Sequence, residues 1–470
     1  MGNRGFRLAI VAVSCAAAAF GATGATAARA AAPAAFGATV TVNTSGKIAG
    51  EINGHYAGLS FESGTLASGK FDDVGDLARM LKNLGSSVMR FGGFSADQKS
   101  YTGASASALA GLARLARASG WSVLYSENLG TYGPKTSAAV TADARKVSAA
   151  LGSHLFAIAC GNEPELFVKK GLRPASYTEA DYLAEAASCL AAVRAGAPKA
   201  TLAGPDTFIV SWLLGYAPDA RKVGLIVHHY YPLGCPGGTA AQLAATLLSP
   251  ALAAATAARF NTVASVARIA HAPLWIDETN TAACGGVRGL SDSYASALWA
   301  IDFMLTGAEH GVSGMNFHGG LGASCHGYTP LCQVAANEYA AQPVYYGLLF
   351  THLLGSGHLL RVTVSTTTTA GNIAAFALRP LTGGGLRLIV ENLSQYTAGA
   401  RLRVGGHPAS ATVLHLTGPS LLATSGVRIQ GAAVAANGSF APGKPDTVRC
   451  SAGSCPVTIA PYTAVLVTVG

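Results

Sequence analysis

The stretch LFAIACGNE, residues 155–163, is a continuous apolar run that ends in a glycine, an asparagine and a glutamate. Its length and hydrophobicity are typical of a strand that is buried on both faces, as in a parallel sheet covered by helices. The polar end places Asn162 and Glu163 where such a strand stops. The same pattern recurs along the chain.

Eight such runs occur between residues 55 and 318, each ending in polar residues. They are HYAGLSFE (55–62), SVMRFGG (87–93), WSVLYSEN (121–128), LFAIACGNE (155–163), KATLAGPD (199–206), VGLIVHHYY (223–231), PLWIDE (273–278) and VSGMNFH (312–318). Alanine-rich stretches expected to be helical separate them, at 72–84, 106–118, 141–151, 177–196, 240–270 and 292–308. Eight strands alternating with helices predict an α/β fold, a closed (β/α)8 TIM barrel. An open doubly wound sheet is the alternative, but no glycine-rich phosphate loop follows the first run.

The pattern changes from about residue 355, where short alternating segments such as LRLIVENL (386–393) are broken by glycine and proline. This predicts an all-β sandwich domain over 355–470, after a barrel over 53–354. The segment before the barrel, residues 31–52, contains a strand-like stretch at 38–52. We expect this segment to join the sandwich.

The first residues resemble a secretory signal peptide. Arg4 and Arg7 precede the apolar run LAIVAVSCAAAAF, and small-residue cleavage sites follow, so residues 1–30 are expected to be removed on export. The apolar run is short for a membrane span, so we expect a secreted protein that has no membrane partner after processing.

The net charge of +9 is spread along the chain rather than gathered in lysine or arginine runs. Nucleic acid is therefore not an expected partner. The sequence also shows no phosphate loop and no obvious metal triad, so no cofactor and no metal are expected.

Cys15 leaves with the signal peptide, and the eight remaining cysteines favour disulfides in an exported chain. Cys325 with Cys332, and Cys450 with Cys455, are close enough in sequence to close small loops. Cys235 and Cys284 both follow strand ends and form a third candidate pair. Zinc is the competing interpretation, but these spacings contain no CxxC motif.

Polar side chains follow the predicted strands at the end where a barrel of this kind carries its chemistry. They are Glu62, Arg90, Glu127, Asn128, Asn162, Glu163, Asp206, the residues 228–231, Glu278 and His318. A pocket rich in carboxylates suits glycoside hydrolysis, which needs one protonated carboxylic acid at the leaving oxygen and one carboxylate at the anomeric carbon. Apolar residues precede Glu163, which makes it the better candidate for the acid.

Two of these strand ends resemble known motifs. GNEPELF (161–167) and WIDETN (275–280) look like the acid/base and nucleophile motifs of the large clan of retaining glycosidases. Further stretches are GLSFES (58–63), MRFGGFSAD (89–97), HHYYP (228–232), ETNTAACGG (278–286), SDSYASALWAIDF (291–303) and MNFHGG (315–320). Together they resemble glycoside hydrolase family 79, which contains β-glucuronidases and heparanases.

The resemblance implies a role for each strand-end residue. Glu163 would be the acid/base, Glu278 the nucleophile, and Asn162 would bond the sugar 2-hydroxyl. The other residues implied in substrate binding are Glu62 for ring hydroxyls, Tyr230 or Tyr231 beside Glu278, and His318 on the pocket floor. The expected substrate is a glycoside or oligosaccharide that contains β-linked glucuronic acid.

A uronate adds a negative charge to a pocket already rich in carboxylates, so donors must face it. No arginine or lysine stands at the last two strand ends except Arg288. Recognition is expected to use the Tyr328 hydroxyl and the backbone N–H groups around Gly285, although Tyr328 could instead pack over its own loop. Phe94 and the segment TAAC (281–284) depart from the family pattern and bear on uronate selectivity.

Several candidate residues have an alternative, structural role. Arg90 is expected to hold a barrel carbonyl or a carboxylate rather than substrate, and Glu165 is expected to be structural. Glu127 and Asp206 could cap helices or line the pocket. For the whole chain, the alternatives to an exo-acting β-glucuronidase are an endo-acting heparanase-like enzyme, a neutral-sugar β-glycosidase and a non-catalytic carbohydrate-binding barrel.

Overall fold

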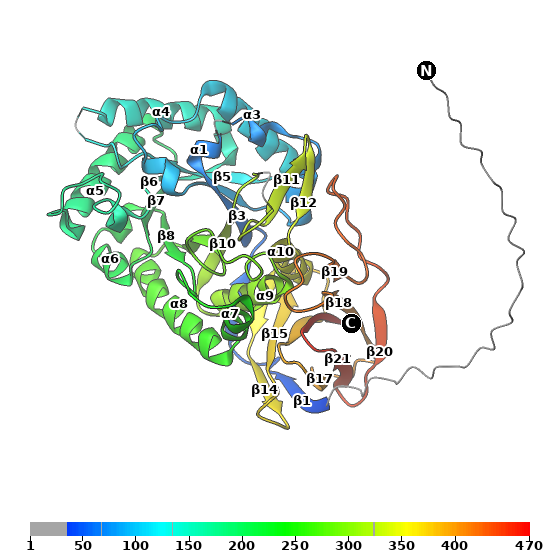
Figure 1. The fold of residues 1–470 in the computed structure, drawn as a ribbon. Coiled ribbons are helices and arrows are strands. Elements are labelled where there is room, and N and C mark those ends of the chain that lie inside the picture. The colour runs from blue at the N-terminus through cyan, green and yellow to red at the C-terminus, as the bar shows by residue number, and fades with distance from the viewer. Residues whose placement is uncertain (1–34, 67, 134, 323–324) are drawn as a thin grey trace, which may run out of the picture.

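Eight parallel strands close into a barrel in the order β10-β3-β4-β5-β6-β7-β8-β9, as the sequence predicted (Figure 1). A computed structural model of the chain describes residues 35–66, 68–133, 135–322 and 325–470. The predicted signal peptide and Cys15 lie outside these residues. The barrel strands are β3 (Ala57–Glu62), β4 (Val88–Gly92), β5 (Ser122–Glu127), β6 (Leu155–Cys160), β7 (Leu202–Thr207), β8 (Leu225–Tyr230), β9 (Leu274–Thr279) and β10 (Val312–His318).

Helices cover the outside of the barrel between successive strands. They are α1 (Ser63–Leu66), α2 (Asp76–Asn83), α3 (Ala106–Ser119), α4 (Ser137–Leu151), α5 (Glu179–Gly196), α6 (Val210–Gly215), α7 (Ala240–Leu247), α8 (Pro250–Ala270), α9 (Tyr294–Glu309) and α10 (Pro343–Leu354). Short 3₁₀ helices are η1 (Lys70–Asp72), η2 (Phe94–Asp97), η3 (Gly152–His154), η4 (Pro164–Leu166) and η5 (Ala220–Lys222).

The expectation of one long helical stretch over 240–270 is wrong, because the chain breaks there into α7 and α8, which meet at 57°. The break has a local cause. Ser249 caps α8 by accepting a hydrogen bond from the Leu252 N–H, and Pro250 occupies the first turn, where its missing N–H costs nothing. In the described part of the chain no single helix is long and apolar enough to cross a membrane, although this bent pair meets the length and composition together.

The inside of the barrel is filled by side chains from alternate strand positions. Its core consists of Val88, Leu124, Ala157, Ala159, Ala203, Leu225, Val227 and Trp275. Trp275 is the large member and lies against the Phe156 ring, with 4.8 Å between ring centroids. Gly314 is required beside it, since a Cβ there would lie 2.3 Å from the indole. The interior is thus packed rather than open, and chemistry is confined to the strand ends.

The rest of the chain forms two β-sheets that pack on each other. One has the order β14-β1-β17-β21, and the other the order β19-β18-β22-β16-β15-β13-β2, with β20 paired to β18. The strands are β1 (Ala35–Val42), β2 (Ile48–Ile52), β13 (Gly357–Leu360), β14 (Val362–Thr366), β15 (Ile373–Pro380), β16 (Leu386–Asn392), β17 (Thr397–Arg403), β18 (Ser410–Thr417), β19 (Arg428–Ile429), β20 (Asp446–Arg449), β21 (Ser454–Ile459) and β22 (Thr463–Val469). A separate hairpin joins β11 (Leu331–Ala335) to β12 (Glu338–Ala341).

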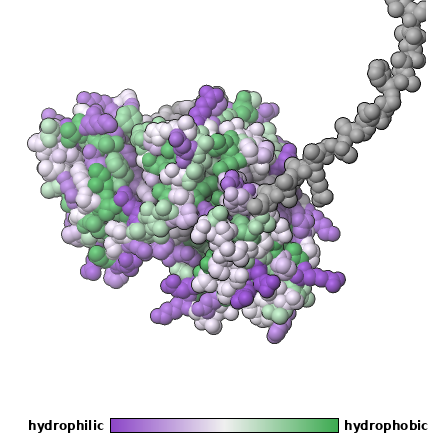
Figure 2. Space-filling model, turned by 60° about the horizontal axis from the view of Figure 1, so that its bottom comes forward, coloured by the Kyte–Doolittle hydropathy of each residue, from purple (hydrophilic) through white to green (hydrophobic). Residues whose placement is uncertain are grey.

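Both early strands belong to these sheets: β1 lies between β14 and β17, and β2 pairs with β13. The larger sheet packs against the barrel side that carries α9 and α10, where the Tyr294 hydroxyl donates to the Leu416 carbonyl at 2.7 Å. Hydrophilic and hydrophobic residues intermix on the face drawn in Figure 2.

Four disulfides cross-link the described chain. Three are the predicted pairs, Cys325–Cys332, Cys450–Cys455 and Cys235–Cys284. The fourth, Cys160–Cys189, was not predicted and joins the end of β6 to α5. Since Cys160 stands three residues before Glu163, this bond ties a candidate catalytic loop to the helix behind it.

Candidate active site

A cavity of about 550 Å³ opens at the carboxyl ends of the barrel strands. It brings together the residues to which the sequence analysis gave a catalytic or substrate-binding role, namely Glu62, Asn162, Glu163, Tyr230, Tyr231, Glu278, Gly285, His318 and Tyr328. Cys235 and Cys284 also line it, so their disulfide joins the two loops that follow β8 and β9 at the cavity wall.

Glu163 and Glu278 face each other across this cavity. One carboxylate oxygen from each, together with a ring nitrogen of His229, all lie within 4.8 Å of one another. Glu163 follows β6 in a left-handed backbone conformation, with φ of 51° and ψ of 61°, and Pro164 then begins η4. A non-glycine residue in this conformation is strained, which is common where a side chain must be aimed at a site. Glu278 lies inside β9 and is buried.

The Glu278 carboxylate is surrounded by donors. Arg90 Nη1 donates to Oε2 at 2.5 Å, and the Tyr231 hydroxyl donates to Oε1 at 2.8 Å. Burial alone would raise the pKa of Glu278, but the charges of His318, His229 and Arg90 and the bond from Tyr231 outweigh it and hold the pKa well below its usual range. Glu278 is therefore ionised at all ordinary pH values, as a nucleophile must be.

Arg90 lies fully buried beneath the cavity and holds carboxylates, as expected, rather than lining the pocket. Besides Glu278, its guanidinium donates from Nη2 to Asn162 Oδ1 and to Asp206 Oδ1, each at 2.8 Å. The side-chain oxygen of Asn162 thus already accepts a hydrogen bond. Its side-chain NH₂ group is the end that can donate to a substrate oxygen.

Asp206 neither caps a helix nor lines the cavity. It accepts from Arg90, and His229 Nε2 lies 2.5 Å from its Oδ1. Burial lowers the pKa of His229, but the Glu278 and Asp206 carboxylates raise it well above its usual value. The protonated ring reaches Glu163 Oε1 from Nδ1 at 3.1 Å, so it links the acid/base candidate to the buried carboxylate. Its neighbour His228 points the other way and is buried, as expected for adjacent strand residues.

Glu62 and His318 form the far side of the cavity. His318 Nε2 lies 3.6 Å from Glu62 Oε1, and its Nδ1 lies 3.9 Å from Glu278 Oε2. Burial lowers the pKa of His318, but the two glutamates raise it. Glu62 also accepts from the Ser95 amide at 2.8 Å and from the Ser95 hydroxyl at 2.5 Å. The substrate-binding candidate Glu62 thus also fixes the turn after β4.

The two adjacent tyrosines have different surroundings. Tyr231 reaches Glu278, whereas the Tyr230 hydroxyl lies 3.4 Å from Thr256 Oγ1 and its ring packs on Phe260 and Phe303. Of the two alternatives left by the sequence, Tyr231 is the one that holds Glu278. Tyr328 lies over it, with 6.0 Å between ring centroids.

Asp97 was missed by sequence reasoning, although it lies within the motif stretch 89–97. Its Oδ1 accepts from the Leu129 and Gly130 amides at 2.9 Å, and its Oδ2 accepts from the Asn162 amide at 2.7 Å. It therefore joins the loops after β5 and β6. Burial, offset in part by these amides, raises the pKa of Asp97 to about 6.

Glu165 is structural, as predicted. Its Oε1 accepts from the Thr207 hydroxyl and from the backbone amides of Phe208 and Ile209.

Glu127 is buried at the end of β5 outside the cavity, and burial together with nearby Asp143 raises its pKa well above the usual value.

Among the residues that the structure describes, two clusters of carboxylate and imidazole atoms are close enough to hold a cation: Glu163, His229 and Glu278, and Asp206, His229 and Asp277. The Arg90 guanidinium already lies against both, at 2.5 Å from Glu278 and 2.8 Å from Asp206. A buried arginine and a protonated histidine supply the positive charge that these carboxylates require.

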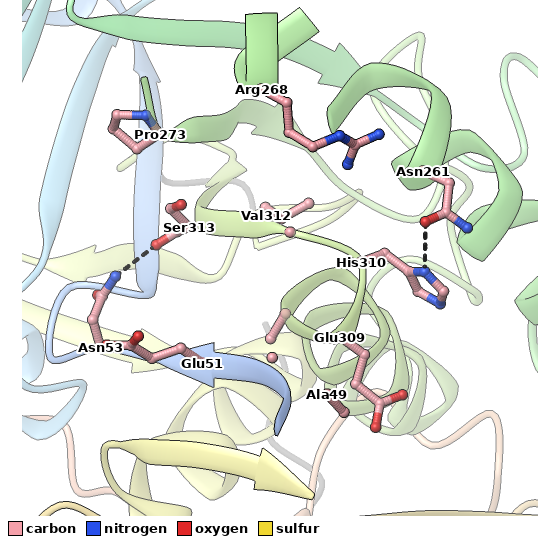
Figure 3. Close-up of a pocket in the computed structure, with 13 residues that line it drawn as sticks. Ala49, Glu51, Asn53, Asn261, Arg268, Pro273, Glu309, His310, Val312 and Ser313 are labelled. Carbon is pink, nitrogen blue, oxygen red and sulfur yellow. Dashed lines mark hydrogen bonds between the residues drawn. The ribbon is translucent and has the colours of Figure 1, made fainter. Parts of the chain in front are cut away.

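A second cavity, of about 620 Å³, lies at the opposite end of the barrel, where β9 and β10 begin (Figure 3). Two pairs of its polar groups are bonded: Asn53 Nδ2 donates to the Ser313 carbonyl at 2.9 Å, and His310 lies 3.0 Å from Asn261. This is the end of the barrel that serves stability rather than chemistry.

Comparisons with known proteins bear on the identity of the site. No family model matches the chain. A beta-glucuronidase from Neurospora crassa is 28% identical over 222 residues, which cover 42% of this chain and 39% of that protein. A beta-glucuronidase from Aspergillus niger is 28% identical over 241 residues, which cover 46% of this chain and 44% of that protein. The match thus spans less than half the length of these curated relatives.

Solved structures share the whole fold. A 4-O-α-L-rhamnosyl-β-D-glucuronidase from Fusarium oxysporum superposes with a TM-score of 0.72 at 20% identity, covering 92% of this chain and all of that one. An arabinofuranosidase of family GH51 from Xanthomonas axonopodis pv. citri gives 0.68 at 14% identity and covers 93% of this chain. The predicted barrel-and-sandwich architecture is confirmed, and the similarity to beta-glucuronidases that the motifs indicated is confirmed by the curated relatives.

Proposed function

We propose that this chain is an exported, retaining exo-β-glucuronidase. The observation that carries the proposal is the opposed pair of Glu163 and Glu278, whose nearest carboxylate oxygens lie within 4.8 Å. Retaining glycosidases separate their two carboxyl groups by about 5–5.5 Å, whereas inverting enzymes need about 6.5–9.5 Å to admit a water molecule.

In the first step Glu278 attacks the anomeric carbon while Glu163 gives its proton to the glycosidic oxygen. The bond from the anomeric carbon to the leaving oxygen breaks, and a covalent glycosyl ester forms on Glu278. Tyr231 and Arg90 hold the attacking carboxylate in place. The Asn162 NH₂ group donates to the sugar 2-hydroxyl, where hydrogen bonds strengthen in the transition state.

In the second step Glu163, now ionised, takes a proton from a water molecule that attacks the same carbon from the side the leaving group vacated. Glu278 is released, and the sugar keeps its β configuration. His229 holds Glu163 Oε1 through both steps, which leaves Oε2 to meet the leaving oxygen and then the water.

A glucuronide is the proposed substrate because the curated relatives are named beta-glucuronidases and one solved neighbour is a rhamnosyl-glucuronidase complex with Rha-GlcA. The Tyr328 hydroxyl and the backbone N–H groups at Gly285 are the proposed partners of the sugar carboxylate. Gly285 and Gly286 have φ of 87° and 78°, a conformation that glycine adopts without strain. Glu62 and His318 would bind the hydroxyls at the far side of the ring.

Export is proposed from the signal-like residues 1–30 and from the four disulfides, which persist in oxidising compartments. The experiment that tests the function is a screen of the purified protein against 4-nitrophenyl β-glycosides of glucuronic acid, glucose, galactose and xylose. Turnover of the glucuronide above the others is expected. Preference for a neutral sugar would refute the substrate, and no turnover of any glycoside would favour a binding protein.

A further inference from the structure

An exposed phenylalanine stands at the mouth of the cavity. Phe94 begins η2, directly after β4, and 52% of its surface is exposed although it lines the cavity beside Glu163. Leu166, at the end of η4, and Phe208, after β7, line the same mouth and are partly exposed. Large apolar side chains gathered at one polar mouth mark a binding surface.

The structure fixes Phe94 from below. Gly93 turns the chain with φ of 71°, and a Cβ there would lie 2.6 Å from the Glu62 carboxyl group. Glu62 in turn accepts from the Phe94 amide at 3.2 Å. Lys170 Nζ lies 5.0 Å from the ring centroid, a distance at which a cation stabilises an aromatic face. The ring is therefore held at the mouth rather than left mobile.

Phe208 is fixed on both sides of its backbone. Its amide donates to Glu165 Oε1 at 2.7 Å, and its carbonyl accepts from Arg259 Nη2 at 2.6 Å. The buried carboxylate of Glu165 is thus used to hold the loop that presents this ring. A side chain held in advance loses little entropy when a ligand packs on it.

The order of strands places these two rings on either side of the proton donor. Phe94 follows β4, Glu163 follows β6 and Phe208 follows β7, and the barrel runs β4-β5-β6-β7. In the proposed reaction the leaving oxygen must lie at Glu163, so the group attached to that oxygen emerges between the two rings.

We infer that Phe94 and Phe208, with Leu166 between them, form the subsite for the leaving group, and that this subsite takes an uncharged ring with an apolar face. An aryl group and the C–H face of a neutral sugar share that chemistry. The inference rests on the proposed glucuronidase activity and adds the class of leaving group to it. Lys169 and Arg259 also line the cavity and Lys170 lies against Phe94, so binding of a sulfated, polyanionic chain is an alternative that the test must distinguish.

The test measures kcat/KM of the wild type, Phe94→Ala and Phe208→Ala on three substrates: 4-nitrophenyl β-glucuronide, a glucuronyl-glucose disaccharide and β-glucuronyl fluoride, whose leaving group has no ring. Leu381→Ala, which removes an equally exposed side chain of the sandwich, is the control. Each phenylalanine variant should lose about tenfold on the aryl substrate, because an aromatic contact and its buried area are lost. The loss on the fluoride should be at least fivefold smaller.

The disaccharide shows whether the subsite binds a sugar ring as well as an aryl ring. If kcat/KM for the disaccharide falls in the variants as it does for the aryl glucuronide, a sugar ring also binds there. If it does not fall, the subsite is restricted to aryl groups. Equal losses on the fluoride and the aryl glucuronide, or no loss on either ring substrate, would overturn the inference. So would a wild-type preference for a sulfated disaccharide over the neutral one. If the wild type hydrolyses none of the three, the proposed glucuronidase activity fails instead.

Discussion

The substitution Tyr231→Phe removes one hydroxyl and leaves the ring. That hydroxyl donates to Glu278 Oε1 at 2.8 Å. The neighbouring Tyr230 offers a matched control, because its hydroxyl lies 3.4 Å from Thr256 Oγ1 and not at the carboxylate. The pair of variants therefore isolates the contribution of a single hydrogen bond to the proposed nucleophile.

The size of the effect follows from the charge of the acceptor. A hydrogen bond to a charged group contributes about 1.5–3 kcal/mol. Since each 1.4 kcal/mol is a factor of ten, Tyr231→Phe should lower kcat/KM for 4-nitrophenyl β-glucuronide by about 10- to 100-fold. Tyr230→Phe should lower it by less than about threefold, as expected for a weak contact remote from the reacting atoms.

The pH profile gives a second check. The Tyr231 hydroxyl helps to lower the pKa of Glu278, so its removal raises that pKa, although His318, His229 and Arg90 still oppose the rise. Because this pKa starts well below its usual range, Glu278 should stay ionised at ordinary pH in both variants. The loss of kcat/KM in Tyr231→Phe should therefore be similar across the pH range rather than growing as the pH falls. Equal losses in the two variants would refute the assignment of Tyr231.

Three further predictions concern other parts of the site and the fold. Glu163→Ala should slow substrates with poor leaving groups far more than 4-nitrophenyl glucuronide, since the latter needs little protonation, whereas a uniform loss across a series of phenyl glucuronides would contradict its role as the acid. Tyr328→Phe should lower kcat/KM about tenfold or more for the glucuronide and much less for the glucoside, as measured with paired 4-nitrophenyl substrates, and equal losses would show that the hydroxyl does not read the carboxylate. Burial raises the pKa of Asp302 to about 6 in the folded chain, whereas it is about 4 in the unfolded chain. Between these two values the unfolded chain gives up the proton and the folded chain keeps it, so the free energy of unfolding falls as the pH rises. The decrease in Tm between pH 5 and pH 7.5 should be smaller in Asp302→Asn, and an unchanged decrease in a thermal melt would contradict the shift.

The barrel was predictable because each of its strands is a continuous apolar run closed by polar residues. The same rule places Glu62, Glu163 and Glu278 at strand ends, and a closed barrel brings such ends together whatever lies between them. This is why the cavity contains all three of these glutamates.

What escaped prediction depends on contacts between loops. Asp97 gives no sign in its own stretch that it binds the Asn162 amide, because the partner lies 65 residues away. Cys160 ends a strand and Cys189 lies 29 residues later inside a helix, so nothing local indicates their bond. The break between α7 and α8 does have a local signal, the pair Ser249 and Pro250, which is typical of a helix start.

The stereochemistry of the first-formed sugar tests the central claim most directly. The claim is that Glu163 and Glu278, with carboxylate oxygens within 4.8 Å, act by double displacement. Proton NMR during hydrolysis of 4-nitrophenyl β-glucuronide should show β-glucuronic acid first, and the α anomer only later, as mutarotation proceeds. First appearance of the α anomer would mean a single displacement by water and would contradict the proposed roles of both glutamates.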